Sequence, residues 1–289
     1  MWSERMRGVK SESCDGPQAL GVSNSIGYRS RMLNSTVVGR VDITPELMIL
    51  RVKPDSGVPA FIPGQYVALG LPGAAPRYAG APDEVEAPAP DKLIKRAYSI
   101  GSSPETSDFF EFYIALVPNG ALTSRLAVVK PGDRLFSQPK VTGTFTLEGV
   151  PNDHNLVLVS TGTGLAPFMS MVRTPLTWSE GRRITIVHGV RYPQDFAYAD
   201  ELSSLAESRE GFKYLPIASR APDSFGGRKG RVQSLFEDSS IALNPEVDHV
   251  FLCGNPAMID DVERDLTSQR GYVVHSKKNP GNLHVEKYW

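Results

Sequence analysis

The spacing of apolar residues changes near residue 150, and this change constrains the fold more than any other feature of the sequence. Before it, short runs rich in β-branched and aromatic residues are separated by turn signals such as Pro118-Asn119-Gly120. Short strands at this spacing favour an antiparallel barrel or sandwich. The expected strands cover residues 36–41, 47–52, 66–71, 96–100, 110–116 and 134–137.

After Pro151 the pattern becomes an alternation of strand-like and helix-like segments. Such alternation indicates a parallel sheet with right-handed crossovers, in which ligands bind at the carboxyl ends of the strands. The expected strands cover residues 156–160, 184–190, 212–218, 249–253 and 283–285. The expected helices cover residues 167–172, 198–207, 232–236 and 257–269. The sequence therefore predicts two domains of different class.

The length of 289 residues is enough for two domains with separate cores. We expect residues 33–149 to form the first domain and residues 150–289 to form the second. Residues 1–32 lack a sustained apolar pattern and are expected to be a flexible tail, with Met32 as an equally good start. Residues 72–91 are rich in Pro, Ala, Gly and acidic residues, so we expect an exposed inserted loop without core positions.

The composition excludes several classes of protein. Hydrophobic residues make up 40% of the chain and charged residues 22%, which is ordinary for a soluble globular protein. The longest aliphatic runs, 156–159 and 184–187, are far too short to span a bilayer. A net charge of -1 gives no general attraction to nucleic acid. Cys14 and Cys253 have no metal-binding spacing, so we expect no metal, disulfide framework or iron–sulfur cluster, and the cytoplasm is the default compartment. The protein is expected to be a monomer, although no sequence feature decides its oligomeric state.

A glycine-rich turn follows the first strand of the second domain. It consists of Thr161, Gly162, Thr163 and Gly164, and Pro167 lies near the first turn of the next helix. Glycine lets the backbone approach a phosphate closely, and the N–H groups and dipole of a helix N-terminus favour an anion. The turn has two glycines rather than the three of the usual dinucleotide fingerprint, so a simple tight connection is the alternative.

Arg96-Ala97-Tyr98-Ser99 forms a candidate flavin site in the first domain. Because alternate residues of a strand share a face, Arg96 and Tyr98 project together, while Ser99 points oppositely or lies at the strand end. An arginine can pair with a phosphate, a tyrosine can pack on an isoalloxazine ring, and a serine hydroxyl can bond near its reactive nitrogen. The alternative is an exposed arginine and tyrosine on an ordinary strand.

A second phosphate-binding turn lies further along the first domain. In Gly120-Ala121-Leu122-Thr123-Ser124, a glycine turn precedes hydroxyl residues at an expected helix start. Such a turn offers backbone donors to a pyrophosphate. Together with the arginine-tyrosine strand, it favours the flavin interpretation over the alternative.

These segments, with Cys253-Gly254-Asn255-Pro256 and the last residues, 285–289, resemble the ferredoxin–NADP reductase family, in particular its bacterial branch. The match covers about residues 36–289. The resemblance implies an antiparallel Greek-key β-barrel that binds FAD, followed by an α/β Rossmann-like parallel sheet that binds NADP. It also implies that NADPH and a one-electron protein carrier exchange electrons through FAD. The tail and the insertion at 72–91 depart from the compact bacterial enzymes.

The resemblance also implies roles for individual residues. It assigns FAD to Arg96, Ala97, Tyr98 and Ser99, the FAD pyrophosphate to Leu122, Thr123 and Ser124, and the NADP pyrophosphate to Thr161, Gly162, Thr163 and Gly164. It places Tyr288 on the isoalloxazine, Trp289 against the adenine and Cys253 near the nicotinamide, and it gives Glu286 a proton-relay or partner role. The expected catalytic residues are Ser99, Cys253, Glu286 and Tyr288. Each assignment has an alternative. Tyr288 and Trp289 could simply be buried in an interdomain core, Cys253 could be a small residue at a strand end, and Glu286 could be an ordinary solvated carboxylate.

Three arginines are candidates for binding the 2′-phosphate that distinguishes NADP from NAD. Arg191 and Arg220 each follow a predicted strand, and Arg231 lies at a predicted helix start. Two of them match positions at which similar reductases bind this phosphate, and the third fits the same cluster. Surface arginines without a ligand are the alternative, but three at one sheet edge favour a binding role.

Because the chain has no cluster of its own, the electron carrier is expected to be a separate ferredoxin or flavodoxin. Such carriers are usually acidic, which favours a basic docking patch. The candidates for this patch are Lys92, Lys95, Lys140, Arg270, Lys277, Lys278 and Lys287. One alternative keeps the fold and makes the chain a reductase component of an oxygenase, or a flavin or ferric reductase. The other is an electron-transfer subunit that works only inside a complex.

Overall fold

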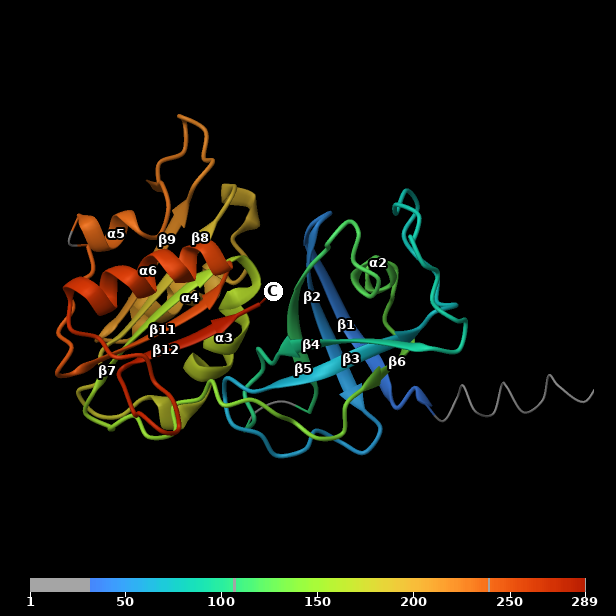
Figure 1. The fold of residues 1–289 in the computed structure, drawn as a ribbon, viewed down its shortest axis with the longest axis horizontal. Coiled ribbons are helices and arrows are strands. Elements are labelled where there is room, and N and C mark those ends of the chain that lie inside the picture. The colour runs from blue at the N-terminus through green and yellow to red at the C-terminus, as the bar shows by residue number, and fades with distance from the viewer. Residues whose placement is uncertain (1–31, 106–107, 239, 289) are drawn as a thin grey trace, which may run out of the picture. The chain divides into compact units, whose positions relative to one another are not determined.

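The first half of the described chain folds into a six-stranded antiparallel sheet (Figure 1). The structure is a computed structural model that describes residues 32–105, 108–238 and 240–288. The strands are β1 (Ser35–Thr44), β2 (Leu47–Pro54), β3 (Tyr66–Pro72), β4 (Leu93–Ser99), β5 (Phe110–Ala115) and β6 (Arg134–Ser137). Their order in the sheet is β4-β3-β6-β1-β2-β5. This half also contains the short helix α2 (Thr123–Leu126).

The edge strands β4 and β5 are joined to make a barrel. The amide of Gly101, just after β4, donates a hydrogen bond of 2.7 Å to the carbonyl of Glu111 in β5. Apolar side chains such as Leu50, Leu69 and Phe112 are fully buried inside. The chain just beyond β4 thus bonds to the other edge strand, which brings the two edges of the sheet together at one end.

The second half forms a six-stranded parallel sheet. Its strands are β7 (Asn155–Thr161), β8 (Ile184–Val190), β9 (Phe212–Ala218), β10 (Arg228–Lys229), β11 (Asp248–Gly254) and β12 (Leu283–Lys287), in the order β10-β9-β8-β7-β11-β12. The central strand β7 is buried from Asn155 to Ser160. A strand covered on both faces has a continuous apolar sequence, which explains the Leu-Val-Leu-Val run of β7.

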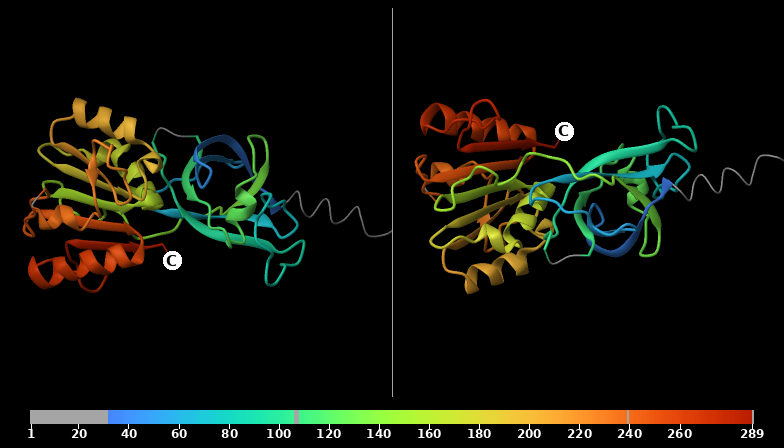
Figure 2. Two further views of the ribbon diagram at one scale, coloured as in Figure 1. Left: turned by 90° about the horizontal axis from the view of Figure 1, so that it is seen from above. Right: turned by 90° about the horizontal axis from the view of Figure 1, so that it is seen from below.

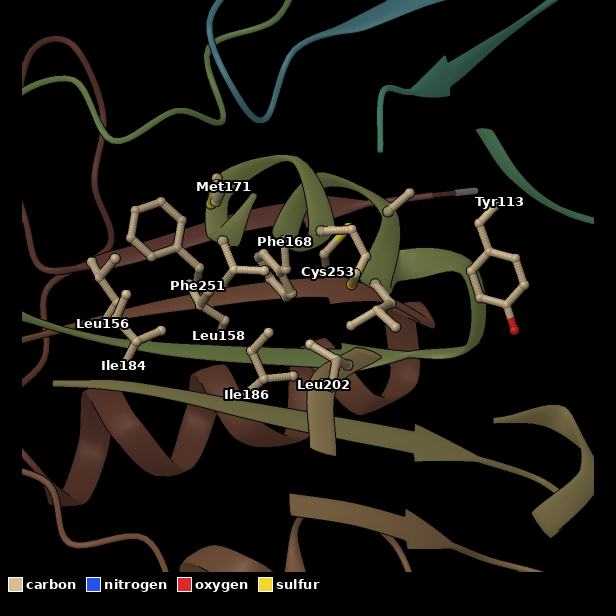
Figure 3. Close-up of a cluster of buried hydrophobic side chains, with 14 of the residues drawn as sticks. Tyr113, Leu156, Leu158, Phe168, Met171, Ile184, Ile186, Leu202, Phe251 and Cys253 are labelled. Atoms are coloured by element: carbon tan, nitrogen blue, oxygen red, sulfur yellow. The ribbon is translucent and has the colours of Figure 1, made fainter. Parts of the chain in front are cut away.

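Helices cover both faces of the parallel sheet. They are α3 (Ala166–Val172), α4 (Ala199–Ser208), α5 (Ser234–Glu237) and α6 (Pro256–Gln269), with short 3-10 turns η1 (Gly162–Leu165), η2 (Pro175–Thr177) and η3 (Pro193–Asp195). Leu156 and Leu158 of β7 pack with α3 and α4, as Figure 3 shows for one cluster. Val157 and Val159 face α5 and α6. Figure 2 shows α4 in gold and α6 in red on opposite faces.

Arg173, at the end of α3, bonds to the barrel strands. Its Nη1 donates to Oε1 of Glu111 at 2.7 Å and to the carbonyl of Gly101 at 2.8 Å. Glu111 also accepts from Nε of Arg51 at 2.8 Å and from the hydroxyl of Tyr198 at 3.0 Å. Burial alone would raise the pKa of Glu111, but Arg173 and Arg51 outweigh it and hold this pKa below its usual value. The buried carboxylate is therefore ionised and ties the barrel to the helical layer.

The fold class predicted from the sequence is confirmed, and each predicted strand and helix has a counterpart. Two differences are larger than a shift of an end by a few residues or fewer: β4 begins at Leu93 rather than at residue 96, and the two-residue strand β10 was not predicted. Between β3 and β4, residues 73–92 form no helix or strand. The predictions for residues 1–31, Cys14 included, and for Trp289 lie outside the described residues. Among the described residues, no helix is long and apolar enough to cross a membrane.

Candidate active site

The loop after β7 has the geometry of an anion site. β7 ends at Thr161, and the chain turns through Gly162 at φ 54° into η1 and then α3. No side chain caps the N-terminus of either helical turn. A Cβ added to Gly162 would meet nothing within 4 Å, so open space lies beside the turn. Uncapped N–H groups beside open space favour a phosphate.

Two of the predicted motifs are packed directly against each other. A Cβ on Gly164 would lie 2.3 Å from the carbonyl oxygen of Cys253, so a residue larger than glycine does not fit. The amide of Asn255 donates to Oγ1 of Thr161 at 2.9 Å. Because β7 and β11 are neighbours in the parallel sheet, their carboxyl ends bring these loops together.

The four residues predicted to be catalytic lie together. The hydroxyl of Ser99, at the end of β4, donates to Oε1 of Glu286 in β12 at 3.1 Å. Sγ of Cys253 lies 3.9 Å from the same oxygen. Tyr288 follows β12, and its amide donates to the carbonyl of Gly254 at 3.4 Å. Burial raises the pKa of Tyr288, and Cys253 and Glu286 act on it as close neighbours.

The electrostatics of this cluster assign protonation states. Burial raises the pKa of Glu286 to about 7, although hydrogen bonds from Ser99 and Cys253 act in the opposite direction. Burial and the nearby Glu286 raise the pKa of the Cys253 thiol well above its usual value. At neutral pH Cys253 is therefore a thiol rather than a nucleophilic thiolate. Glu286 is the group in the cluster that can gain or lose a proton near neutral pH.

The residues of the predicted flavin strand differ in how far they are exposed. Arg96 and Ala97 are exposed, and Nη1 of Arg96 donates to the carbonyl of Lys95 at 2.7 Å. Tyr98 packs edge-on against Phe112, with ring centroids 6.3 Å apart, and burial raises its pKa. Ser99 ends the strand, which agrees with one of the two positions expected for it. Arg96 thus keeps most of its donors available to a ligand.

Both hydroxyls of the turn at residues 120–124 form hydrogen bonds within the protein. Oγ1 of Thr123 donates to the carbonyl of Val117 at 3.1 Å and accepts from its amide at 3.2 Å. The Leu122 side chain is buried in the barrel core. Ser124 is fully buried, and its hydroxyl donates to the carbonyl of Ala121 at 3.3 Å and accepts from Nε of Arg77 at 3.2 Å. No side chain caps the start of α2, but the amides of Ser124 and Arg125 already donate to the carbonyls of Gly120 and Leu122.

The three predicted arginines follow the expected edge of the sheet. Arg191 comes directly after β8, Arg220 lies two residues beyond β9, and Arg231 precedes α5. All three are exposed, and the amide of Arg220 donates to the carbonyl of Arg191 at 2.7 Å. In the described part of the chain none of them forms a salt bridge. Arg228 and Lys229 of β10 add further exposed cations that the sequence alone did not indicate.

The predicted docking patch is only partly available. Nζ of Lys287 pairs with Asp260 at 2.6 Å, and Nε of Arg270 pairs with Asp265 at 2.7 Å. Lys277 lines a cavity of about 150 Å³ that Glu286 also borders. Because their charges are paired within the protein, Lys287 and Arg270 are less available to bind an acidic partner.

Comparisons with known proteins agree with this arrangement. A model of the oxidoreductase NAD-binding domain family matches residues 158–264. The chain is 34% identical over 239 residues to the ferredoxin–NADP reductase of Pseudomonas aeruginosa, covering 78% of this chain and 86% of that protein. It is 32% identical over 235 residues to the flavodoxin/ferredoxin–NADP reductase of Escherichia coli, covering 79% and 88%.

Solved structures with the same fold include two with similar sequences. A ferredoxin NADP+ reductase from Neisseria gonorrhoeae with bound FAD and NADP superposes with a TM-score of 0.73 at 26% identity, covering 89% of this chain and 98% of that one. A cytochrome P450 reductase from Amycolatopsis superposes with a TM-score of 0.70 at 26% identity, covering 89% of this chain and 69% of that one. The similarity therefore extends over both sheets.

Proposed function

Because the chain belongs to the ferredoxin–NADP reductase family, we propose that it uses FAD to transfer electrons between NADPH and a separate ferredoxin or flavodoxin. The observation that carries the proposal is the meeting of Ser99, from the predicted flavin strand, with Glu286 and Cys253 at the ends of β12 and β11. Residues from both sheets thus complete one cluster, where a flavin and a nicotinamide would have to meet.

The residues present fit both cofactors. For FAD we propose the exposed Arg96, the ring of Tyr98 and the turn of Leu122, Thr123 and Ser124. For NADP(H) we propose the uncapped turn after β7 and the exposed arginines after β8 and β9, which form no salt bridge in the described chain. In domain terms, residues 33–149 bind FAD and residues 150–289 bind NADP(H). FAD, when bound, converts between the two-electron chemistry of the nicotinamide and the one-electron chemistry of the carrier.

The protein groups supply positioning and proton transfer. The Ser99 hydroxyl donates to Oε1 of Glu286. A carboxyl with a pKa of about 7 exchanges protons readily at neutral pH. Glu286 would therefore replace a proton that the Ser99 hydroxyl gives up to a bound cofactor, and would regain one from solvent. The protonated Cys253 packs against this pair and helps to exclude water. Tyr288 covers the cluster and moves aside when a nicotinamide binds.

The test is a steady-state comparison of NADPH and NADH with ferredoxin and with flavodoxin as acceptors. The proposal predicts a yellow protein that reduces at least one carrier and prefers NADPH. Turnover that does not respond to either carrier would overturn it. In that case the similarity to the P450 reductase would favour a reductase component of an oxygenase.

The proposal also covers the oligomeric state of the enzyme, its compartment and the surface that docks the carrier. We propose that it acts as a monomer in the cytoplasm. We also propose that it docks an acidic carrier through those members of the predicted patch that form no salt bridge in the described part of the chain, namely Lys92, Lys95, Lys140, Lys277 and Lys278. Sedimentation analysis tests the monomer, and the salt dependence of carrier reduction tests the docking patch. A rate that does not fall with added salt would count against the patch.

A further inference from the structure

The cavity of about 150 Å³ that Glu286 borders lies beside the edge strand β12. Three parts of the chain form its walls: Thr144 and Phe145 before β7, the loop residues His275, Ser276 and Lys277, and residues 284–286 of β12. Ser276 and Lys277 are exposed. His284 is buried, and Glu286 is half-buried. The cavity therefore leads from the protein surface to Glu286.

Glu286 lies between this cavity and the cluster of predicted catalytic residues. His284 and Glu286 share a face of β12, because alternate residues of a strand project to the same side, and both border the cavity. The contacts from the Ser99 hydroxyl and from Sγ of Cys253 both end on Oε1 of Glu286. Oε2 accepts no hydrogen bond from the other described residues, so it is the oxygen that remains for water in the cavity.

The cavity walls are polar enough to hold water. They offer the hydroxyls of Thr144 and Ser276, the ammonium group of Lys277 and the imidazole of His275. A cavity of this volume has room for several water molecules, and polar walls supply the hydrogen-bond partners that buried water requires. Burial lowers the pKa of the neighbouring His284 to about 3, so this ring takes up no proton at neutral pH.

The proposed reaction requires one proton to pass between the site and solvent for each NADPH. A hydride that is divided into two electrons for two one-electron carriers leaves one proton behind, and the reverse direction takes one up. Bound cofactors would cover Glu286 on the side that faces Ser99 and Cys253. The proton therefore needs a second way to solvent.

We propose that this cavity is the path by which Glu286 exchanges protons with solvent during turnover. The proposal rests on the proposed function, in which Ser99 and Glu286 transfer the proton. A proton from the Ser99 hydroxyl passes to the carboxylate of Glu286, and the carboxyl group then gives one proton to water in the cavity. Thr144 and Ser276 form walls of the path and do not themselves donate the proton.

Substitutions that fill the cavity test the proposal. Thr144→Phe and Ser276→Phe each bring a ring into the cavity, from different walls. Asn279→Phe is the control, because Asn279 is exposed on the same loop but does not border the cavity. The FAD-loaded enzyme is reduced with one equivalent of NADPH and reoxidised with ferricyanide, which accepts an electron but no proton and needs no docked carrier. A pH-indicator dye in weak buffer records proton release, and the visible absorbance records flavin oxidation.

Both filled variants should release the proton about 10-fold or more slowly, with the flavin spectrum and the NADPH affinity of the wild type. Asn279→Phe should release it at the wild-type rate. Thr144 forms no side-chain hydrogen bond in the described chain, so Thr144→Phe tests the path even if Ser276→Phe unfolds. Release at the wild-type rate in Thr144→Phe would overturn the path.

Glu286→Gln separates this proposal from the proposed function. If it slows proton release while the filled variants do not, the path alone is overturned. If it leaves the rate unchanged, the proton-transfer role of Glu286 is overturned as well. Slow release in Glu286→Gln and in both filled variants, with a normal rate in Asn279→Phe, supports the path.

Discussion

Ser99 and Glu286, separated by 187 positions in the sequence, share a hydrogen bond of 3.1 Å from the serine hydroxyl to the carboxylate. The bond joins the end of a barrel strand to the edge strand β12 of the parallel sheet. Because the carboxylate is largely buried, its protonation is linked to folding as well as to catalysis.

We expect Glu286→Gln to change the pH dependence of stability. The pKa is raised from 4.5 to about 7, so the contribution of this carboxyl to stability is complete below about pH 4.5 and is lost as pH rises through 7. Relative to the wild type, the glutamine variant should gain about 1 to 2 kcal/mol between pH 5 and pH 8. Urea unfolding at saturating FAD measures this difference, and a difference independent of pH would contradict it.

Arg220→Ala should weaken NADPH binding by about 1 to 3 kcal/mol and spare NADH, because the arginine would lose a charge-assisted bond to the 2′-phosphate. The matched control is Arg183→Ala. Arg183 is exposed and precedes β8, at the opposite end of the strand from Arg191. Nucleotide titration measures both, and equal losses for NADPH and NADH would refute the assignment.

Tyr288→Ala should loosen flavin stacking and raise the affinity for oxidised nicotinamide, because the ring would no longer cover the cluster of Cys253 and Glu286. The expected signs are a shift of the visible flavin spectrum and a lower Kd for NADP+. Tyr288→Phe is the control, since it keeps the ring. Unchanged spectra and affinity in the alanine variant would argue against this role.

Glu111→Gln should cost about 3 kcal/mol of stability, because it leaves Arg173 and Arg51 without a buried counter-charge. Asp42→Asn is the comparison, since Asp42 pairs with Arg40 at the surface and its side chain is 59% exposed. That variant should lose less than about 1 kcal/mol. Chemical denaturation distinguishes the two, and similar losses would mean that burial does not decide the strength of these pairs.

Two buried histidines within a cluster of four should make the fold sensitive to mild acid. His154, His249, His275 and His284 form a chain of ring contacts, and Nδ1 of His249 lies 3.0 Å from Nε2 of His284. Burial lowers the pKa of His249 to about 4 and that of His284 to about 3, so both are neutral in the fold. Stability should therefore fall as pH drops from about 6.5 towards 4. His284→Gln should show a smaller loss in unfolding experiments at pH 7 and pH 5.

Helices and strands whose apolar residues follow a clear spacing were predictable from the sequence. The apolar run of β7 and the glycine turn after it have local causes, so strand, turn and helix were all expected correctly. The Ser99–Glu286 bond was not predictable from local pattern, because its partners come from different sheets. The insertion was the hardest segment to predict, because nothing in its composition indicated that Ala75 would pack against the barrel core or that Glu84 would pair with Arg125.

The close approach of Gly164 to the carbonyl of Cys253 limits which substitutions these two loops tolerate. Any side chain at residue 164 would push the two motif loops apart, so the phosphate turn and the thiol position must change together or remain fixed. The exposed arginines after β8 and β9 carry no such constraint. Under the proposed assignment, single substitutions of these arginines would therefore change the preference between NADP and NAD. The two motif loops, by contrast, could change only together.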